Sequence, residues 1–188
     1  MPPYAELHCI SNFSFLKGAS HPEEMVERAK TLGYRAIAIT DECSFAGIVR
    51  AHVAAQAVDI QLLIGSEFRL QEGTRFILIA KNRSGYGYIT NLISTARRRA
   101  PKGDYYLSYK DFVETESNCI AVWLPNAEAL QEIRAKEIAW LKNYFENQVW
   151  IGVTQLLINH ESRQTHILEQ LSQITMTPLV AIGSAQCI

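Results

Sequence analysis

The sequence lacks several features that would assign it to a class of protein at once. None of its 188 residues belong to an unbroken apolar run of about 18, which excludes a conventional membrane-spanning helix. Its 18 Lys and Arg nearly balance 19 Asp and Glu, and the net charge of −1 gives no overall attraction to DNA or anionic lipid. Since 48% of the residues are hydrophobic, the chain is not a disordered one. Residues 1–188 are therefore expected to form a single folded domain.

Disulfide and zinc frameworks are also missing. The four cysteines lie far apart without a C-x-x-C pair, at Cys9, Cys43, Cys119 and Cys187. Each has apolar neighbours, which predicts small buried side chains. The N-terminal residues contain no basic stretch followed by an apolar core, so no signal peptide is expected. We expect a protein of the reducing cytoplasm with no membrane partner.

Short apolar runs alternate with longer amphipathic segments along the chain. The runs predict strands at residues 4–8, 35–40, 61–66, 75–80, 119–124, 149–154 and 179–183. Helices are expected between most of them, the first begun by a capping box of Ser20 and Glu23. A hairpin through residues 71–73 would join the third and fourth strands. The pattern predicts an α/β fold with a mostly parallel sheet, either open or closed into a barrel.

Polar residues follow several of these strands, where α/β folds gather their functional groups. His8, Asp41 and Glu67 would meet at one rim if the sheet closes. An imidazole with two carboxylates is a plausible shell for a divalent metal that activates water. The alternative is structural, because Asp41 is also placed to cap a helix beginning near Ser44.

Residues 7–20 read Leu-His-Cys-Ile-Ser-Asn-Phe-Ser-Phe-Leu-Lys-Gly-Ala-Ser, followed by Ala-Ile-Ala-Ile-Thr-Asp at 36–41 and Ile-Gly-Ser-Glu-Phe at 64–68. This series resembles the polymerase-and-histidinol-phosphatase (PHP) domain of bacterial C-family DNA polymerases, especially their error-prone branch. The resemblance implies a distorted seven-stranded β/α barrel with a metal cluster at its carboxyl rim. In active members of the family, that cluster supports phosphoester hydrolysis.

The sequence departs from the family pattern at most ligand positions. Ile10 stands where the opening motif has a second histidine, and Glu42 stands where a histidine follows Asp41. Residues 183–186 read Gly-Ser-Ala-Gln in place of Gly-Asp-x-His, and the stretch at 154–157 is altered to Thr-Gln-Leu-Leu. Only His8, Asp41 and Glu67 remain, a set that would hold at best one zinc or manganese ion weakly. We predict a degenerate metal site without independent phosphoesterase activity.

The resemblance then implies a structural and interaction role. The domain would pack against the polymerase core of the same or an adjacent polypeptide, contact DNA only indirectly, and support translesion synthesis after DNA damage. The closely spaced aspartates of a polymerase palm are not identifiable, so the chain is not expected to copy DNA. The family's barrel has further elements, which predicts that this one is incomplete at its C-terminal end. The alternatives are a stand-alone metal-dependent phosphoesterase and a small domain that binds single-stranded nucleic acid.

A basic segment at residues 97–102 motivates the last alternative. Arg97, Arg98, Arg99 and Lys102 could contact a phosphate backbone, with Tyr105 and Tyr106 near them to stack on bases. Arginines at the end of a helix also favour its dipole and keep a surface soluble, so a structural reading stays open.

Overall fold

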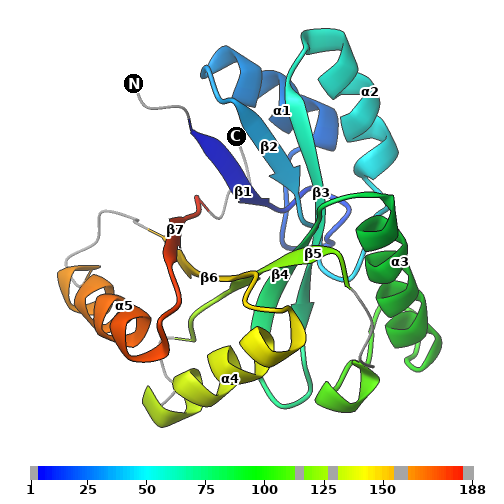
Figure 1. Cartoon of the computed structure of the whole chain (residues 1–188). Coiled ribbons are helices and arrows are strands. Elements are labelled where there is room, and N and C mark those ends of the chain that lie inside the picture. Colours follow the sequence, from blue (N-terminus) through cyan, green and yellow to red (C-terminus); the bar gives the residue numbers. More distant parts are fainter. Residues whose placement is uncertain (1–3, 113–116, 127–130, 155–160, 184–188) are drawn as a thin grey trace.

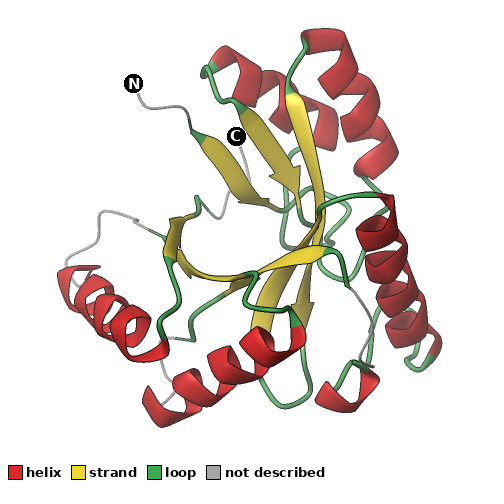
Figure 2. Cartoon of the chain, viewed as in Figure 1, coloured by secondary structure: helices red, strands yellow, loops and turns green. Residues whose placement is uncertain are grey.

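The computed structural model describes residues 4–112, 117–126, 131–154 and 161–183. Within these residues, seven strands alternate with helices, except that one strand directly follows another where the third meets the fourth (Figures 1 and 2). The strands are β1 Ala5–Cys9, β2 Ala36–Ile39, β3 Gln61–Arg69, β4 Arg75–Ala80, β5 Cys119–Trp123, β6 Val149–Val153 and β7 Leu179–Ala181. The helices are α1 Pro22–Thr31, α2 Ile48–Val58, α3 Arg83–Arg98, a 3-10 turn at Tyr109–Asp111, α4 Gln131–Tyr144 and α5 Glu161–Thr175.

The strands form one sheet in sequence order, β1 to β7. All neighbours are parallel except that β4 runs antiparallel to both β3 and β5, which confirms the predicted hairpin. The first part of β3, residues 61–64, pairs with β2, while residues 65–69 pair with β4. The prediction that the third strand ends at Ser66 was wrong, because pairing with β4 continues it to Arg69. Glu67 thus lies within a strand.

The sheet curves into a nearly closed barrel, as Figure 1 shows. Apolar side chains from β1 through β5 and from β7 meet in a cluster of their own, which identifies the inner face of the sheet: Leu7, Ala38, Leu63, Ile77, Ile79, Ile120, Val122, Leu124, Val180 and Ile182. The expected distorted seven-stranded barrel is therefore confirmed. The expectation that further elements would follow concerns sequence outside the described residues and stays a prediction.

Hydrogen bonds to one buried carboxylate join the two ends of the sheet. Glu6 of β1 is only 4% exposed, and its Oε1 accepts a hydrogen bond of 2.8 Å from the backbone N–H of Gly183, just after β7. The same oxygen accepts from the N–H of His8 at 2.9 Å, and Oε2 accepts from the Tyr4 hydroxyl at 2.9 Å. We call these contacts the seam, because they link β1 to the segment after β7 where the described strands form no ladder.

Helices cover the outside of the barrel in two groups. Side chains of α1 and α2 form one cluster with the outer faces of β1 and β2, whereas α3, α4 and α5 cover β3 to β6 with a larger one. Cys9, Cys43 and Cys119 are buried and unpaired, as predicted, and Cys187 lies outside the described residues. No helix among the described residues is long and apolar enough to cross a bilayer.

The starts of the first two helices differ from expectation. In α1 the N-cap is His21, whose N–H donates to Glu24 Oε2 at 2.7 Å, so the predicted Ser20–Glu23 capping box was wrong by one residue. Pro22 explains the offset, since it lacks an N–H and fits the first helical position. Helix α2 begins at Ile48 behind Gly47, without a side-chain cap, so Asp41 does not cap it.

Candidate functional site

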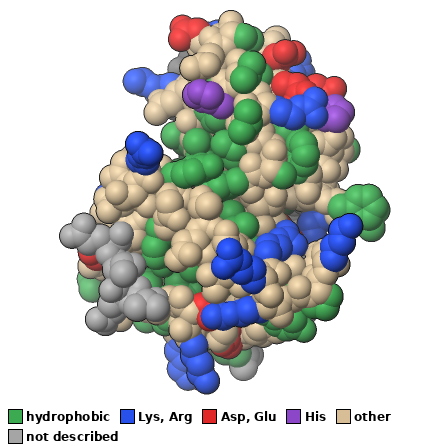
Figure 3. Space-filling model, turned by 90° about the vertical axis from the view of Figure 1, so that its right-hand side faces the viewer, with side chains coloured by type: hydrophobic (Ala, Val, Ile, Leu, Met, Phe, Trp, Pro, Cys, Tyr) green, Lys and Arg blue, Asp and Glu red, His purple; other side chains and the backbone are tan. Residues whose placement is uncertain are grey.

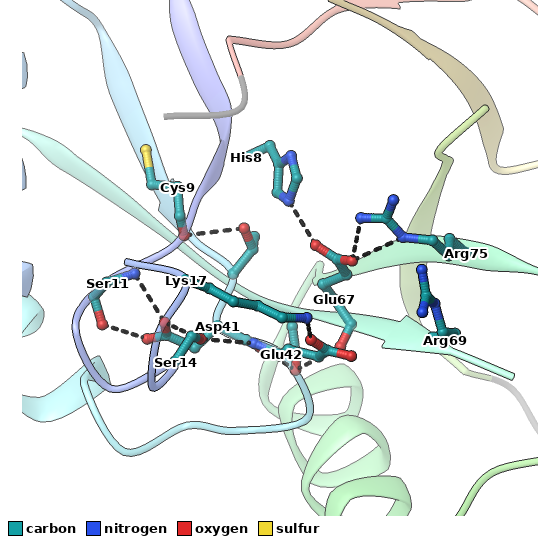
Figure 4. Close-up of polar contacts among 12 residues, drawn as sticks. His8, Cys9, Ser11, Ser14, Lys17, Asp41, Glu42, Glu67, Arg69 and Arg75 are labelled. Atoms are coloured by element: carbon teal, nitrogen blue, oxygen red, sulfur yellow. Dashed lines mark hydrogen bonds and ion pairs between the residues drawn. The ribbon is translucent and has the colours of Figure 1, made fainter. Parts of the chain in front are cut away.

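His8 and Glu67 meet at the carboxyl rim of the barrel (Figure 4). They come from β1 and β3, on either side of β2, and their side chains are 4% and 2% exposed. His8 Nε2 lies 2.9 Å from Glu67 Oε2. Because an ionised carboxylate only accepts hydrogen bonds, Nε2 carries the hydrogen in this contact. These two residues were predicted to lie close together, and in the structure they form a direct hydrogen bond.

Arg75 of β4 completes the contacts of Glu67. Its Nε and Nη2 donate to Glu67 Oε1 at 3.1 and 2.6 Å, a two-pronged contact from a positively charged guanidinium. Burial alone would raise the pKa of Glu67, but the hydrogen bond from His8 and the charge and hydrogen bonds of Arg75 outweigh it. The pKa falls from 4.5 to about 2, so Glu67 is ionised at neutral pH.

Asp41 has different partners. Its side chain, in a residue only 1% exposed, accepts from the N–H of Ser11 at 2.8 Å, from Ser11 Oγ at 2.6 Å and from Ser14 Oγ at 2.7 Å. Both carboxylate oxygens are used in this way, and all the donors belong to the loop between β1 and α1. Asp41 therefore anchors this loop, a role that neither the metal-ligand prediction nor the capping alternative contained.

Glu42 also faces this loop. One of its oxygens forms an ion pair with Lys17, and the other accepts from the Tyr105 hydroxyl at 2.8 Å. Burial, followed by the nearby charge of Glu42, raises the pKa of Tyr105, so the phenol stays protonated and donates. Glu42 thus connects the β1–α1 loop to the segment that follows α3.

These contacts do not suit a bound divalent metal. Within the ranges that the structure describes, no group of three or more His, Cys, Asp and Glu side chains is arranged to hold one. Glu67 already has a cation beside it in Arg75, and Asp41 is surrounded by donors rather than open to a metal. Ile10, where the resemblance led us to expect a second histidine, is 3% exposed and packs as a core residue. Positions 155–157 and 184–186 lie outside the described residues.

The basic segment at 97–102 has two kinds of side chain. Arg97 is used internally: it donates to the carbonyls of Glu42, Cys43, Gly103 and Asp104 at 3.1–3.2 Å and lies over the Tyr105 ring. Arg99 forms an ion pair with Asp111. Arg98 and Lys102 are exposed. Lys and Arg side chains do gather on the lower half of the face that carries α2 and α3 (Figure 3). These contacts and exposures do not show whether the segment binds nucleic acid, so the predicted nucleic-acid contact stays a prediction.

Three structural partners were missed by reasoning from the sequence: Arg75 at Glu67, the serines at Asp41, and Glu6 at the seam. For Arg75 a signal existed, since the predicted hairpin brings the fourth strand beside the third and places a cation within reach of Glu67. For Glu6 there was none, because its partner lies 177 residues away along the chain.

Comparison with known proteins agrees with this geometry. The model of the PHP domain family matches residues 6–171. The chain is 46% identical over 180 residues to the error-prone DNA polymerase of Saccharophagus degradans and 47% identical over 184 residues to that of Pseudomonas aeruginosa. These matches cover 96% and 97% of this chain but only 17% of each polymerase.

Solved structures with much lower identity share the fold. An amidohydrolase from Chromobacterium violaceum superimposes with a TM-score of 0.70 at 14% identity, covering 98% of this chain and 88% of that protein. A two-domain protein from Bacteroides vulgatus, described as containing a predicted PHP-like metal-dependent phosphoesterase, gives 0.61 at 16% identity, covering 97% and 52%.

The barrel and its rim therefore define a PHP domain, and the chain belongs to that family. Within the family it is homologous to a segment of error-prone DNA polymerases, as the resemblance in the sequence predicted. The chain spans less than a fifth of the length of these curated relatives.

Proposed function

We propose that this chain is a degenerate PHP domain that serves an error-prone C-family DNA polymerase as a structural and interaction module. In this role it packs against the polymerase core of the same or an adjacent polypeptide and performs no hydrolysis itself. Its contact with DNA is indirect, through the polymerase, and its place of action is the cytoplasm.

The observation that carries the proposal is the contact of Arg75 with Glu67. A guanidinium at 2.6 Å from Glu67 Oε1 supplies the positive charge that a metal would otherwise bring to this carboxylate. A hydrolytic centre with two or three ions needs bridging carboxylates and several imidazoles, whereas here one carboxylate is neutralised and the other holds a loop. The same contacts argue against even one weakly bound zinc or manganese ion.

Metal analysis tests the degenerate site. The purified chain, expressed with zinc and manganese in the medium, should contain far less than one ion per molecule. It should not hydrolyse a chromogenic phosphodiester when either metal is added. Stoichiometric metal that is lost on His8→Ala together with hydrolysis, in a variant whose circular dichroism is unchanged, would instead establish the stand-alone phosphoesterase.

The role in a polymerase is supported by the relatives, which are named error-prone DNA polymerases and match this chain over nearly its full length. In a bacterium that encodes this chain with a polymerase core, deleting its coding segment should reduce mutagenesis and survival after ultraviolet damage. The rim variant Glu67→Gln should have a smaller effect than the deletion. Equal survival and mutagenesis with and without the segment would contradict the proposed role.

A further inference from the structure

The loop between β1 and α1 presents apolar side chains to solvent. Phe15 is 84% exposed and Leu16 is 89% exposed, and Phe13 beside them is 41% exposed. We call these three residues the apolar knob. Its neighbour Lys17 is neutralised by the ion pair with Glu42, so the tip of the loop offers apolar surface without an unpaired charge. Large apolar side chains clustered on a surface in this way are typical of an interaction site.

The loop is held rigidly although its tip is exposed. Asp41 accepts three hydrogen bonds from its serines, and Ser14 carbonyl oxygen accepts from the N–H groups of Lys17 and Gly18 at 2.9 and 3.1 Å. Gly18 packs so closely on the Ser11 carbonyl that an added Cβ would lie 2.1 Å from its oxygen. A loop fixed in this manner loses little conformational freedom on binding, which favours association.

Leu16 has a left-handed backbone conformation, with φ of 62°. This conformation is unfavourable for a residue with a branched side chain and persists only where the surroundings impose it. The turn therefore holds Leu16 outward at the expense of backbone strain. A hollow of about 450 Å³ lies directly beside the knob, lined by Phe13, Phe15, Lys17, Arg97 and Tyr105 among others. The protruding knob and the adjacent hollow together form one surface that a partner of complementary shape can contact.

We propose that the apolar knob is the surface by which this domain docks onto the polymerase core, inserting Phe15 and Leu16 into an apolar pocket there. This inference rests on the proposed function. A core is favoured as occupant because the matched polymerases are more than five times as long as this chain, so most of their surface lies beyond the PHP domain. Single-stranded DNA is less favoured, because Arg97, which lines the hollow beside the knob, already donates to backbone carbonyls within the domain.

The test uses a full-length chimera in which this chain replaces its matching segment in the error-prone polymerase of Saccharophagus degradans. One variant carries Phe15→Ser with Leu16→Ser. A matched control carries Val49→Ser with Val53→Ser, two apolar residues of α2 that are 72% and 61% exposed. In the isolated chain, both double variants should keep the parent melting temperature, since none of these side chains is buried.

Amide hydrogen exchange then distinguishes the surfaces. Exchange at residues 13–18 should be at least about tenfold slower in the chimera than in the isolated chain, and the knob variant should abolish this slowing while the control keeps it. Unchanged exchange in the chimera, or an equal loss in the control, would overturn the proposal. So would a dimer of the isolated chain in sedimentation, or binding of labelled oligo-dT, that disappears in the knob variant.

Failure of this inference and failure of the proposed function give different results. The proposed function would be contradicted if a polymerase without any PHP segment were as stable and active as the chimera that carries the unmodified chain. It would also be contradicted if the chimera with the unmodified chain misfolded. A polymerase that needs the segment but tolerates the knob variant would contradict only the assignment of the docking surface.

Discussion

The rim and the seam of the barrel each depend on one buried carboxylate, and the two are stabilised by different means. Glu67 at the rim is 2% exposed and pairs with the charged guanidinium of Arg75. Glu6 at the seam is 4% exposed and accepts from three neutral donors, two backbone N–H groups and the Tyr4 hydroxyl. The rim is therefore sensitive to charge, whereas the seam is sensitive to the space around the carboxylate.

The largest effect is expected from removing the charge at the rim. Arg75→Leu leaves Glu67 buried beside His8 alone and should lower the free energy of unfolding by about 2–4 kcal/mol, a range reduced because the arginine is 35% exposed. Its control is Arg69→Leu, directly opposite in the β3–β4 ladder and exposed, which should cost less than about 0.5 kcal/mol. Urea unfolding measures both. Equal losses would show that the ladder matters and the ion pair does not.

Acid should also lower the free energy of unfolding through the rim. The pKa of Glu67 in the folded chain, about 2, lies below its ordinary value of 4.5, so its stabilisation is complete above pH 4.5 and is lost as pH falls towards 2. The loss amounts to roughly 3 kcal/mol from this residue.

The control for the acid effect is Glu67→Gln, which cannot titrate. The stability difference between the parent chain and this variant should narrow steadily from pH 5 to pH 2.5 in urea unfolding. A difference that stays constant over this range would contradict the lowered pKa.

At the seam, adding a single methyl group should be enough to destabilise the fold. A Cβ added at Gly183 would lie 2.0 Å from Glu6 Oε2, so Gly183→Ala should destabilise the fold by about 1–3 kcal/mol. Gly87→Ala in α3 meets nothing within 4 Å and should stabilise it by about 0.5–1 kcal/mol. Thermal unfolding of the two variants should therefore shift in opposite directions. A shift of the same sign in both variants would contradict the proposed steric clash between residue 183 and Glu6.

The smallest effect is expected at Asp41, which resembles the seam in using neutral donors. Ser14→Ala removes one of its three hydrogen bonds and should cost about 1 kcal/mol. Thr90→Ala, on the exposed side of α3, should stay within about 0.5 kcal/mol of the parent. If Ser14→Ala also falls within that range, Asp41 does not anchor the loop as its contacts indicate.

Reasoning from the sequence predicted the seven strands, the hairpin between β3 and β4, and the nearness of His8 to Glu67, because each depends on local patterns or on the order of neighbouring strands. It did not predict the serine partners of Asp41, since the same strand-end position suits a metal ligand, a helix cap or an anchor for a loop. The choice among these depends on where Ser11 and Ser14 lie in space.

The sequence by itself determined the family, because membership follows from residue identity along the chain. Only the tertiary structure decided what the remaining polar residues do. Arg75 reaches Glu67 across a hairpin, and Glu6 reaches Gly183 across the whole chain. Burial makes these contacts decisive, since a carboxylate removed from water must find a charge or donors wherever the fold supplies them.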